Sequence, residues 1–190
     1  MTIPLDISSN RSARKYSSTE LAGRVLWSMF SPLFRHSPRL CWGWRNQLLR
    51  AFGAIIGRNV QIHPSARIFL PWNLKIGDWS SIGFDALIYN LGSVTIGDRA
   101  TISQRAHLCA GSHDHRDPSM RLLKPPISIG DGVWICADAF VGPGVSVGDG
   151  AVVGARAVVV NDVSPGNVMI GNPARCVSHR IRPQSPDESP

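Results

Sequence analysis

The fold is decided by the stretch Ile96–Val160, whose second part reads IGDGVWICADAFVGPGVSVGDGAVVGARAVVV over residues 129–160. Aliphatic residues recur there at every sixth position, with one interruption between Leu108 and Ile129. These positions are Ile96, Ile102, Leu108, Ile129, Ile135, Val141, Val147, Val153 and Val159. A period of six fits neither a 3.6-residue helix nor a hairpin meander. It is typical of an all-β solenoid, a β-helix in which each hexapeptide forms one short strand and one turn.

The same period begins further upstream, with two longer steps. The upstream positions are Ile62, Ile68, Ile76, Ile82 and Ile88, and the steps to Ile76 and to Ile96 are eight residues long. Three hexapeptides make a triangular coil of 18 residues, with the aliphatic side chains pointing inward. Gly, Asn or Asp is expected at the corners, where a positive φ is needed.

A tripeptide repeat, Ile/Val-Gly-Asp, fixes the phase of the coils. It occurs at residues 76–78, 96–98, 129–131 and 147–149, so the spacings are 20, 33 and 18. A spacing of 18 is one coil, and a spacing of 20 is one coil with a two-residue bulge. The spacing of 33 indicates one coil that carries an excursion of about fifteen residues, placed within the loop 110–126.

The excursion carries a polar cluster, Ser112-His113-Asp114-His115-Arg116-Asp117. Loops held by a rigid scaffold are common places for binding and catalytic residues. We therefore predict that the repeat is a scaffold and that the excursion holds the active site.

Composition places the chain among globular proteins. It has 190 residues, 43% hydrophobic and 17% charged, which fits one domain with appendages rather than a disordered or integral membrane protein. Its four cysteines are scattered without a C-x-x-C pair, so neither a zinc knuckle nor a disulfide framework is indicated. Reduced thiols and the absence of a signal sequence predict a cytoplasmic location.

The basic excess lies in residues 1–58, where nine Lys/Arg face two Asp/Glu, and seven of the fourteen aromatic residues lie there too. We expect poor order in residues 1–18 and helices over 19–34 and 37–54. This segment either caps the solenoid or contacts a membrane or an anionic lipid-linked partner through residues 19–54. No motif for nucleic acid accompanies the charge. The predicted organisation is a helical segment 1–58, a β-helix domain 59–182 and a disordered tail 183–190.

Several motifs resemble those of the hexapeptide-repeat acyltransferases. Within that family the chain is most similar to the acetyltransferases named for colanic acid biosynthesis, relatives of galactoside and maltose O-acetyltransferases. The motifs are Pro71-Trp72-Asn73-Leu74, Tyr89-Asn90-Leu91, Leu108-Cys109-Ala110-Gly111-Ser112-His113-Asp114 and Gly171-Asn172-Pro173-Ala174-Arg175, and the resemblance covers roughly residues 20–180. It implies a left-handed parallel β-helix, a homotrimer, and acetyl-CoA bound between neighbouring prisms.

Acetyl transfer to a sugar hydroxyl needs a base, because an alcohol is a poor nucleophile at neutral pH. Histidine suits this task, with an ordinary pKa of about 6.5. His113 aligns with the catalytic histidine of the related O-acetyltransferases and is assigned the base role. His115 is expected to contact the acceptor, and Asp114 either orients the loop or binds the acceptor. His107 lies inside the repeat and is expected only to occupy a corner.

Further site residues are predicted around this base. Asp85 and Asn90 lie one coil earlier and are expected to face the same cleft as acceptor-binding residues. Trp134 is expected either to form an apolar wall beside the thioester or to have only a structural role. The resemblance implies CoA contacts at Ala137 and Ala155, which leave room for the pantetheine arm, and at the basic residues Arg175 and Arg180.

The expected function is acetyl transfer from acetyl-CoA to a hydroxyl of a sugar or lipid-linked glycan in exopolysaccharide or other surface-glycan synthesis, with no metal. Two alternatives stay open. The cluster of His107, Cys109, His113 and His115 allows a zinc enzyme like the gamma-class carbonic anhydrases, although its spacing differs from theirs. A non-catalytic β-helix scaffold is the other alternative, and it predicts no CoA binding.

Overall fold

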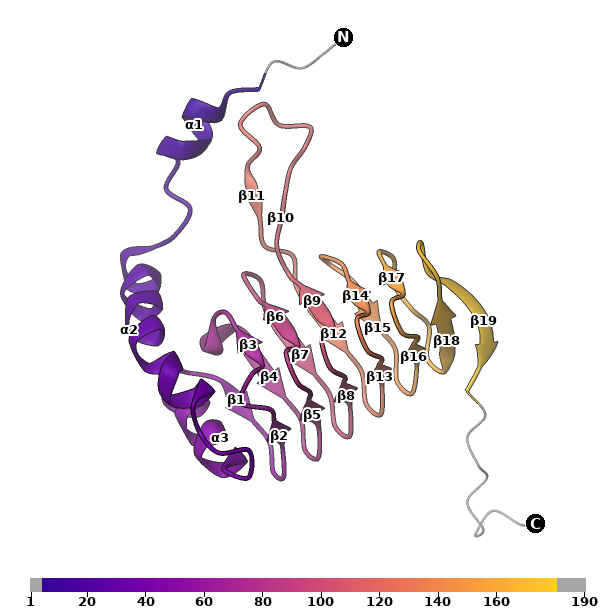
Figure 1. Ribbon diagram of the computed structural model, residues 1–190. Helices are drawn as coiled ribbons and strands as arrows, with labels where there is room; N and C mark the ends of the chain where they lie inside the picture. Colours follow the sequence, from indigo (N-terminus) through magenta and orange to yellow (C-terminus); the bar gives the residue numbers. More distant parts are fainter. Residues whose placement is uncertain (1–4, 181–190) are drawn as a thin grey trace, which may run out of the picture.

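The computed structural model describes residues 5–180, which form a parallel β-helix with helices packed at its first coil (Figure 1). Each coil contributes one short strand to each of three sheets. Sheet A holds β1 (Ile55–Ile56), β4 (Leu74–Ile76), β7 (Val94–Ile96), β12 (Ile127–Ile129) and β15 (Ser146–Val147). Sheet B holds β2 (Gln61–Ile62), β5 (Ser81–Ile82), β8 (Thr101–Ile102), β13 (Trp134–Ile135), β16 (Val152–Val153), β18 (Asn167–Ile170) and β19 (Arg175–His179). Sheet C holds β3 (Arg67–Ile68), β6 (Leu87–Tyr89), β9 (His107–Cys109), β14 (Phe140–Val141) and β17 (Val158–Val159).

The strand register confirms the coil arithmetic. In sheet A, Ile76 pairs with Ile96, Ile96 with Ile129, and Ile129 with Val147. The β-helix begins at β1, slightly before the predicted boundary at residue 59, because Ile56 already pairs with Ile76. The tail 183–190 lies outside the described residues.

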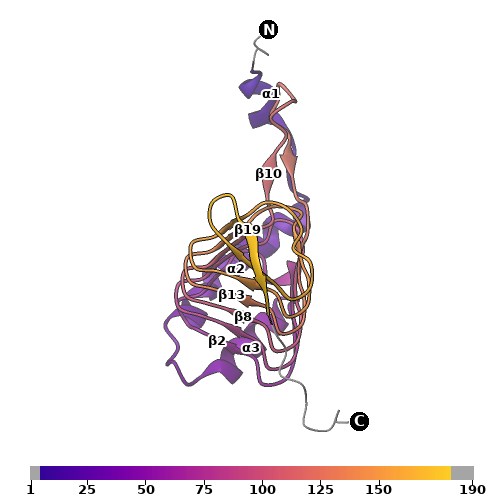
Figure 2. The same cartoon turned by 90° about the vertical axis from the view of Figure 1, so that its right-hand side faces the viewer.

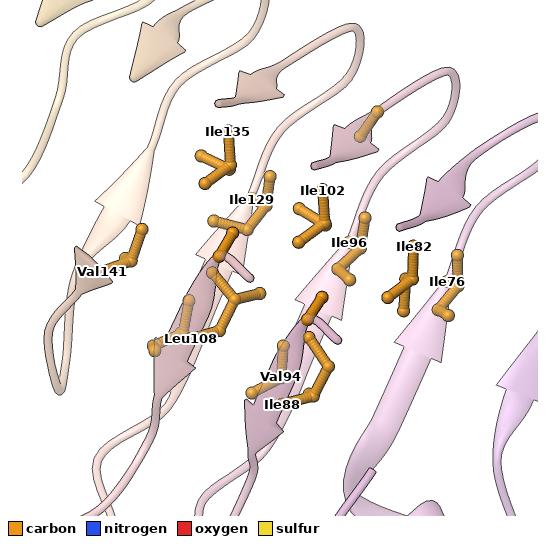
Figure 3. Close-up of a cluster of buried hydrophobic side chains, with 14 of the residues drawn as sticks. Ile76, Ile82, Ile88, Val94, Ile96, Ile102, Leu108, Ile129, Ile135 and Val141 are labelled. Atoms are coloured by element: carbon orange, nitrogen blue, oxygen red, sulfur yellow. The ribbon is translucent and has the colours of Figure 1, made fainter. Parts of the chain in front are cut away.

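Two side chains per hexapeptide fill the prism, not one. The predicted aliphatic position is buried in every coil, as Ile82, Ile102 and Ile135 show (Figure 3). A second inward residue lies two positions earlier and is often alanine, as at Ala86 and Ala106. Full burial of each aliphatic side chain contributes about 1.5–3 kcal/mol. The small second residue lets the narrow prism close around the large one.

The Ile/Val-Gly-Asp repeat forms a ladder along the corner between sheets A and B. The amides of Asp78 and Asp98 donate to the Oδ1 atoms of Asp98 and Asp131, at 2.7 and 2.8 Å. A Cβ on Gly77 or Gly97 would overlap that same carboxylate oxygen. Glycine is therefore needed at this position of the repeat, because a side chain there would collide with the carboxylate of the next coil.

The expectation of Gly, Asn or Asp at the left-handed corners holds at some of them, such as Asp85 and Gly132, but not at all of them. Four such corners carry Trp79, Arg99, Arg105 and Arg156, with φ between 52° and 60°. The left-handed conformation costs an ordinary residue roughly 1–2 kcal/mol. The amide of each donates to a carbonyl of the preceding coil, at 2.8–2.9 Å, and these hydrogen bonds hold the backbone in place.

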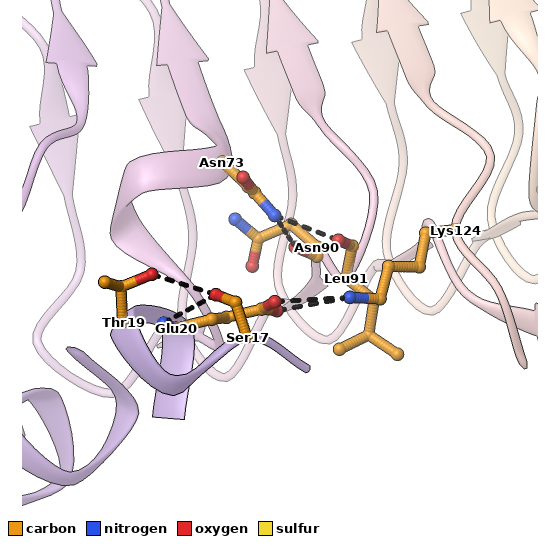
Figure 4. Close-up of polar contacts among 7 residues, drawn as sticks. All are labelled: Ser17, Thr19, Glu20, Asn73, Asn90, Leu91 and Lys124. Atoms are coloured by element: carbon orange, nitrogen blue, oxygen red, sulfur yellow. Dashed lines mark hydrogen bonds and ion pairs between the residues drawn. The ribbon is translucent and has the colours of Figure 1, made fainter. Parts of the chain in front are cut away.

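All three irregular steps fall at one corner, between sheets C and A. They are the turn η1 (Pro71–Asn73), the loop 90–93, and the hairpin of β10 (Ser112–His113) and β11 (Leu122–Leu123). Asn73 Nδ2 donates to the carbonyl oxygens of Asn90 and Leu91, at 3.2 and 2.9 Å (Figure 4). The insertions are therefore joined to one another, and the hairpin projects from a reinforced corner.

Helices α2 (Ser18–Arg35) and α3 (Trp42–Ala51) cover the open edge of the first coil. Both fall near the predicted ranges, but α3 begins four residues after Pro38, because residues 37–41 form a turn. Their polar side chains donate to first-coil carbonyls: Trp27 to Ile68, Arg45 to Ile62, Asn46 to Val60 and Arg50 to Ile56. These are the contacts of a solenoid cap, since an uncovered strand edge leaves backbone groups unpaired.

Helix α1 (Ile7–Ser12) lies beside the tip of the hairpin (Figure 2). The Asp6 amide donates to the Pro118 carbonyl at 2.8 Å, and Asn10 Nδ2 donates to the carbonyls of Ser119 and Met120. The expectation of poor order was therefore wrong from residue 5 onward, because the hairpin supplies partners distant in sequence. Of the helices within residues 5–180, none has the length and apolar character needed to cross a bilayer.

Candidate active site

His113 ends the first strand of the hairpin and is exposed. Its Nδ1 lies 2.6 Å from the Met120 carbonyl oxygen, across the antiparallel pair that joins His113 to Leu122. A carbonyl only accepts, so Nδ1 must carry the hydrogen. The other nitrogen, Nε2, is then left with its lone pair, which is the form a general base needs.

Asp114 orders the hairpin behind this histidine. Its amide donates to the Arg121 carbonyl at 2.9 Å, and its Oδ1 accepts from the Arg116 amide at 3.0 Å. Of the two predicted roles, these contacts match orientation of the loop. His115 is exposed beyond it. Asp117 accepts from the backbone and side chain of Ser119, and these hydrogen bonds lower the pKa of Asp117.

Asn90 does not face a cleft, contrary to prediction. It is fully buried, its Oδ1 accepts from the Leu70 amide at 2.9 Å, and its Nδ2 donates to the Leu70 carbonyl at 2.6 Å. Both ends of the amide are used inside the fold, so Asn90 binds the turn of the preceding coil. Asp85 is half-buried at the corner between sheets B and C, where its amide donates to Ser65 Oγ at 2.8 Å. It lies at a different corner from His113 within one chain.

Three of the four predicted CoA residues gather at the corner between sheets B and C. Ala137 and Ala155 stack there in successive coils, and the amide of Arg156 donates to the Ala137 carbonyl at 2.9 Å. Phe84 and Gln104 occupy the same position in earlier coils. Their side chains are larger, so the two alanines leave more space at this corner than the earlier coils do. Arg175 lies at the end of this column, after a cis Asn172–Pro173 peptide.

Arg180 is apart from this group. Its Nη1 donates to the Gly132 carbonyl at 2.9 Å, which places it at the corner between sheets A and B. Arg175 is the first residue of β19 and Arg180 follows its last residue, so the length of the strand separates the two arginines. The two arginines predicted to contact CoA therefore lie at different corners of one chain.

A column of charged residues runs beside the alanines. None of its members was predicted from the sequence as a site residue. Arg105 donates to both carboxylate oxygens of Asp138, at 2.7 and 2.8 Å, and this hydrogen bonding lowers the pKa of Asp138. Arg156 follows one coil later and is exposed beside Ala155. The only sequence signal for it was its place directly after Ala155.

Trp134 lies on the outer face of sheet B, 48% exposed, and its Nε1 donates to Ser103 Oγ at 2.9 Å. Ser103 lines a groove of about 830 Å³ between sheet B and residues 39–45, which the sequence analysis did not identify. His63 also lines it, and burial, then Arg39 and Arg45, lower the pKa of His63. Its Nδ1 accepts from the Ser65 amide at 3.2 Å, so Nε2 carries the ring hydrogen.

The residues of the zinc alternative do not converge. His107 packs edge to face against Phe140, and burial lowers its pKa. Its Nε2 is buried and has no hydrogen-bond partner among the described residues. Burial raises the pKa of the Cys109 thiol, which disfavours the thiolate that zinc binds. Within residues 5–180 no three His, Cys, Asp or Glu side chains are arranged to hold a metal ion. The zinc interpretation therefore lacks a donor set in the described part of the chain.

Comparison with known proteins identifies the family. Residues 126–161 match the family model described as bacterial transferase hexapeptide (six repeats). The chain is 44% identical over 158 residues to WcaF of Escherichia coli (strain K12), which is named as a colanic acid biosynthesis acetyltransferase. That match covers 83% of this chain and 87% of WcaF.

Solved structures agree with this relationship. A hexapeptide-repeat-containing acetyltransferase of Vibrio cholerae O1 biovar eltor, complexed with acetyl coenzyme A, superposes with a TM-score of 0.80 at 26% identity, over 89% of this chain and 93% of that one. A galactoside acetyltransferase in complex with coenzyme A also gives 0.80 at 26% identity, over 92% and 91%. The chain belongs to the hexapeptide-repeat acetyltransferases.

Proposed function

We propose that this protein transfers the acetyl group of acetyl-CoA to a hydroxyl of a sugar during synthesis of an exopolysaccharide or other surface glycan. The observation that carries the proposal is the hydrogen bond from His113 Nδ1 to Met120, which leaves Nε2 free to act as a base. The relation to WcaF supports the glycan setting. A scaffold without activity would have no need for a histidine held in one tautomer on a projecting hairpin.

In the proposed reaction, Nε2 of His113 takes the proton of the sugar hydroxyl as its oxygen attacks the thioester carbon. The tetrahedral intermediate then collapses, the carbon–sulfur bond breaks, and the proton passes from Nε2 to the CoA sulfur. The products are the acetyl ester and the free thiol. An amide N–H at the site would stabilise the oxyanion.

The corner of Ala137, Ala155 and Arg175 is the proposed CoA site. The alanines admit an extended chain along the prism, and arginines suit phosphate groups through paired N–H donors. Arg156, exposed beside Ala155, is a further candidate for a phosphate contact.

This corner and His113 lie at different corners of one prism, so we propose that a second copy of the chain completes the site within a homotrimer. The outward face of sheet C is a suitable contact surface, because Leu87, Phe140 and Val158 are half-buried on it in a single chain.

Mixing two inactive variants tests this arrangement. His113→Ala removes the base, and Ala155→Trp blocks the CoA corner. If the site joins two chains, co-refolded mixtures recover part of the activity, since some interfaces combine an intact hairpin with an intact corner. Light scattering gives the oligomeric state in parallel. Mixtures as inactive as their parents, from confirmed mixed oligomers, would contradict a shared site.

The acceptor is tested by thiol release from acetyl-CoA against a panel of nucleotide-sugars and lipid-linked oligosaccharides. We expect turnover that depends on a sugar acceptor, with the acetyl ester found on that sugar by mass spectrometry. CoA binding with acetyl transfer to none of these sugars would refute the sugar-hydroxyl assignment, and absence of CoA binding would favour the scaffold.

We also propose a cytoplasmic location with peripheral membrane contact, supported by the outward face of α2. Val25, Met29 and Leu33 are 52–67% exposed there, and Arg35 follows them. The test is flotation with anionic liposomes, comparing the wild type with Met29→Gln/Leu33→Gln. Truncation is unsuitable because it removes the cap. Equal flotation of both proteins, or none by the wild type, would contradict the contact.

A further inference from the structure

A groove of about 540 Å³ runs between helix α2 and strand β3, on the side of the cap that adjoins sheet C. Its apolar part is formed by Leu21, Val25, Trp27 and Phe69. Its charged part consists of Arg24, Arg35 and Arg67. None of the described residues that line it is acidic, so three cations surround an apolar floor without an internal counter-charge.

Arg24 is held in a fixed orientation inside this groove. Its guanidinium carbon lies 4.2 Å from the centre of the Tyr16 ring and 5.2 Å from that of Phe69. Its Nη1 is buried and has no hydrogen-bond partner within residues 5–180. A buried N–H donor is normally paired, because an unpaired one is unfavourable. The position of Arg24 therefore suits an anionic ligand that would supply the acceptor.

The segment around Tyr16 does not need Arg24 to hold it. Lys124 at the base of the hairpin also lies over the Tyr16 ring, at 4.6 Å, and forms an ion pair with Glu20 at 3.2 Å (Figure 4). This pair already ties the start of α2 to the hairpin. Since Glu20 is engaged by Lys124, it does not neutralise Arg24.

A row of aromatic rings connects the groove to the hairpin that carries His113. The Phe69 ring lies 5.0 Å from the Tyr89 ring, centre to centre. The Tyr89 ring in turn lies against Gly111, two residues before His113. A molecule whose anionic group lay at Arg24 would therefore have a sugar attached to it directed towards the hairpin, over aromatic faces of the kind on which sugar rings pack.

We infer that this groove binds the diphosphate and adjoining hydrocarbon of a lipid-linked sugar, so that the acceptor is delivered on its lipid carrier. The inference rests on the proposed function for the identity of the sugar-bearing ligand. Arginines match phosphate oxygens with paired N–H donors, and the apolar floor matches the first part of the lipid chain. The exposed apolar face of α2 lies on the same helix, which places the groove beside the surface proposed to touch the membrane.

The test measures binding of farnesyl diphosphate to the full-length protein by calorimetry, with farnesol and inorganic pyrophosphate as comparisons. We expect farnesyl diphosphate to bind at least tenfold more tightly than either comparison. Arg24→Met, which keeps a side chain between the two rings, and Arg67→Gln should each weaken binding at least tenfold. Arg24→Lys should retain part of it. Arg99→Gln is the matched control, because Arg99 is exposed at the corner between sheets A and B.

Three results would overturn the inference. The first is that farnesol binds as tightly as farnesyl diphosphate. The second is that Arg99→Gln loses as much affinity for farnesyl diphosphate as Arg24→Met does. The third is that phosphatidylglycerol vesicles displace farnesyl diphosphate as readily as a longer prenyl diphosphate does. The last result would assign the groove to bulk phospholipid. CoA binding should be the same in all four variants. The calorimetry requires no turnover, so a failure of the proposed acetyl transfer would be seen separately, as absent thiol release with prenyl diphosphate binding intact.

Discussion

His113 Nδ1 lies 2.6 Å from the carbonyl oxygen of Met120, on the opposite strand of the hairpin. Met120 has a positive φ of 49°, which turns its carbonyl within the turn that closes the hairpin. Asn10 from the N-terminal segment donates to the same carbonyl at 2.9 Å. The tautomer of the proposed base therefore depends on a backbone group that two distant parts of the chain position.

Replacing His113 by Ala is expected to lower kcat for acetyl transfer by about 10²–10⁴-fold, the usual contribution of a general base. The dissociation constant of CoA should not change, because His113 is proposed to act on the sugar hydroxyl and the thioester rather than to hold the phosphates or the pantetheine arm. Steady-state kinetics and calorimetry check the two parts. His36→Ala, at an exposed histidine of the cap, should leave both constants unchanged. Full activity in His113→Ala would end the base assignment.

Replacing Gly97 by Ala is expected to destabilise the fold by about 2–4 kcal/mol. The new Cβ would overlap Asp131 and displace the carboxylate that accepts from the Asp98 amide, so packing strain adds to a lost hydrogen bond. Chemical denaturation measures the change. Gly43→Ala is the control, because nothing lies within 4 Å of its added methyl and alanine favours a helix by up to about 1 kcal/mol. Similar losses of stability in Gly97→Ala and Gly43→Ala would mean that the ladder is not the reason for glycine at position 97.

Replacing Arg45 by Met is expected to lower stability by roughly 3 kcal/mol or more. The side chain is 1% exposed and donates to the carbonyls of Ile62, Pro38 and Arg39, and burial lowers its pKa. Each buried acceptor left without a donor costs about 1–3 kcal/mol. Thermal unfolding measures the loss of stability. The unfolding temperature of Arg45→Lys is expected to lie between those of the wild type and Arg45→Met. An unchanged unfolding temperature in Arg45→Met would show that the cap tolerates buried carbonyl groups without a hydrogen-bond donor.

Stability is expected to decrease as the pH falls below about 6.5, partly because of His107. Burial lowers the pKa of His107 in the folded state, whereas the unfolded chain keeps the ordinary value. The unfolded state therefore binds the proton first, and stability is lost as the pH falls from about 6.5 towards the lowered pKa of the folded state. The His107→Leu variant should lose less stability between pH 7 and 5 than the wild type, while His36→Leu should match it. An equal loss of stability in the wild type and in His107→Leu would exclude the contribution of His107. The pKa of His63 is lowered too, so His63 also reduces stability at low pH, in both proteins.

Sequence patterns alone were sufficient for the scaffold. Each coil pairs only with its neighbours, so the spacings of 20, 33 and 18 residues translate directly into strand register and into one excursion. The excursion contains His113, and the repeat predicts where it leaves the prism. These properties are local and periodic, which is why they can be read without a structure.

The tertiary structure decided which residues share a corner and which polar groups are already used. Asn90 was expected to face a cleft, but the Leu70 amide and carbonyl occupy both ends of its side-chain amide. The basic side chain of Arg45 is likewise buried, where it donates to the Ile62 carbonyl. Arg175 and Arg180 are close in sequence, yet one strand carries them to different corners. Hydrogen-bond partners from other coils determine these outcomes. A periodic pattern specifies the coil and not the neighbours that each polar side chain meets.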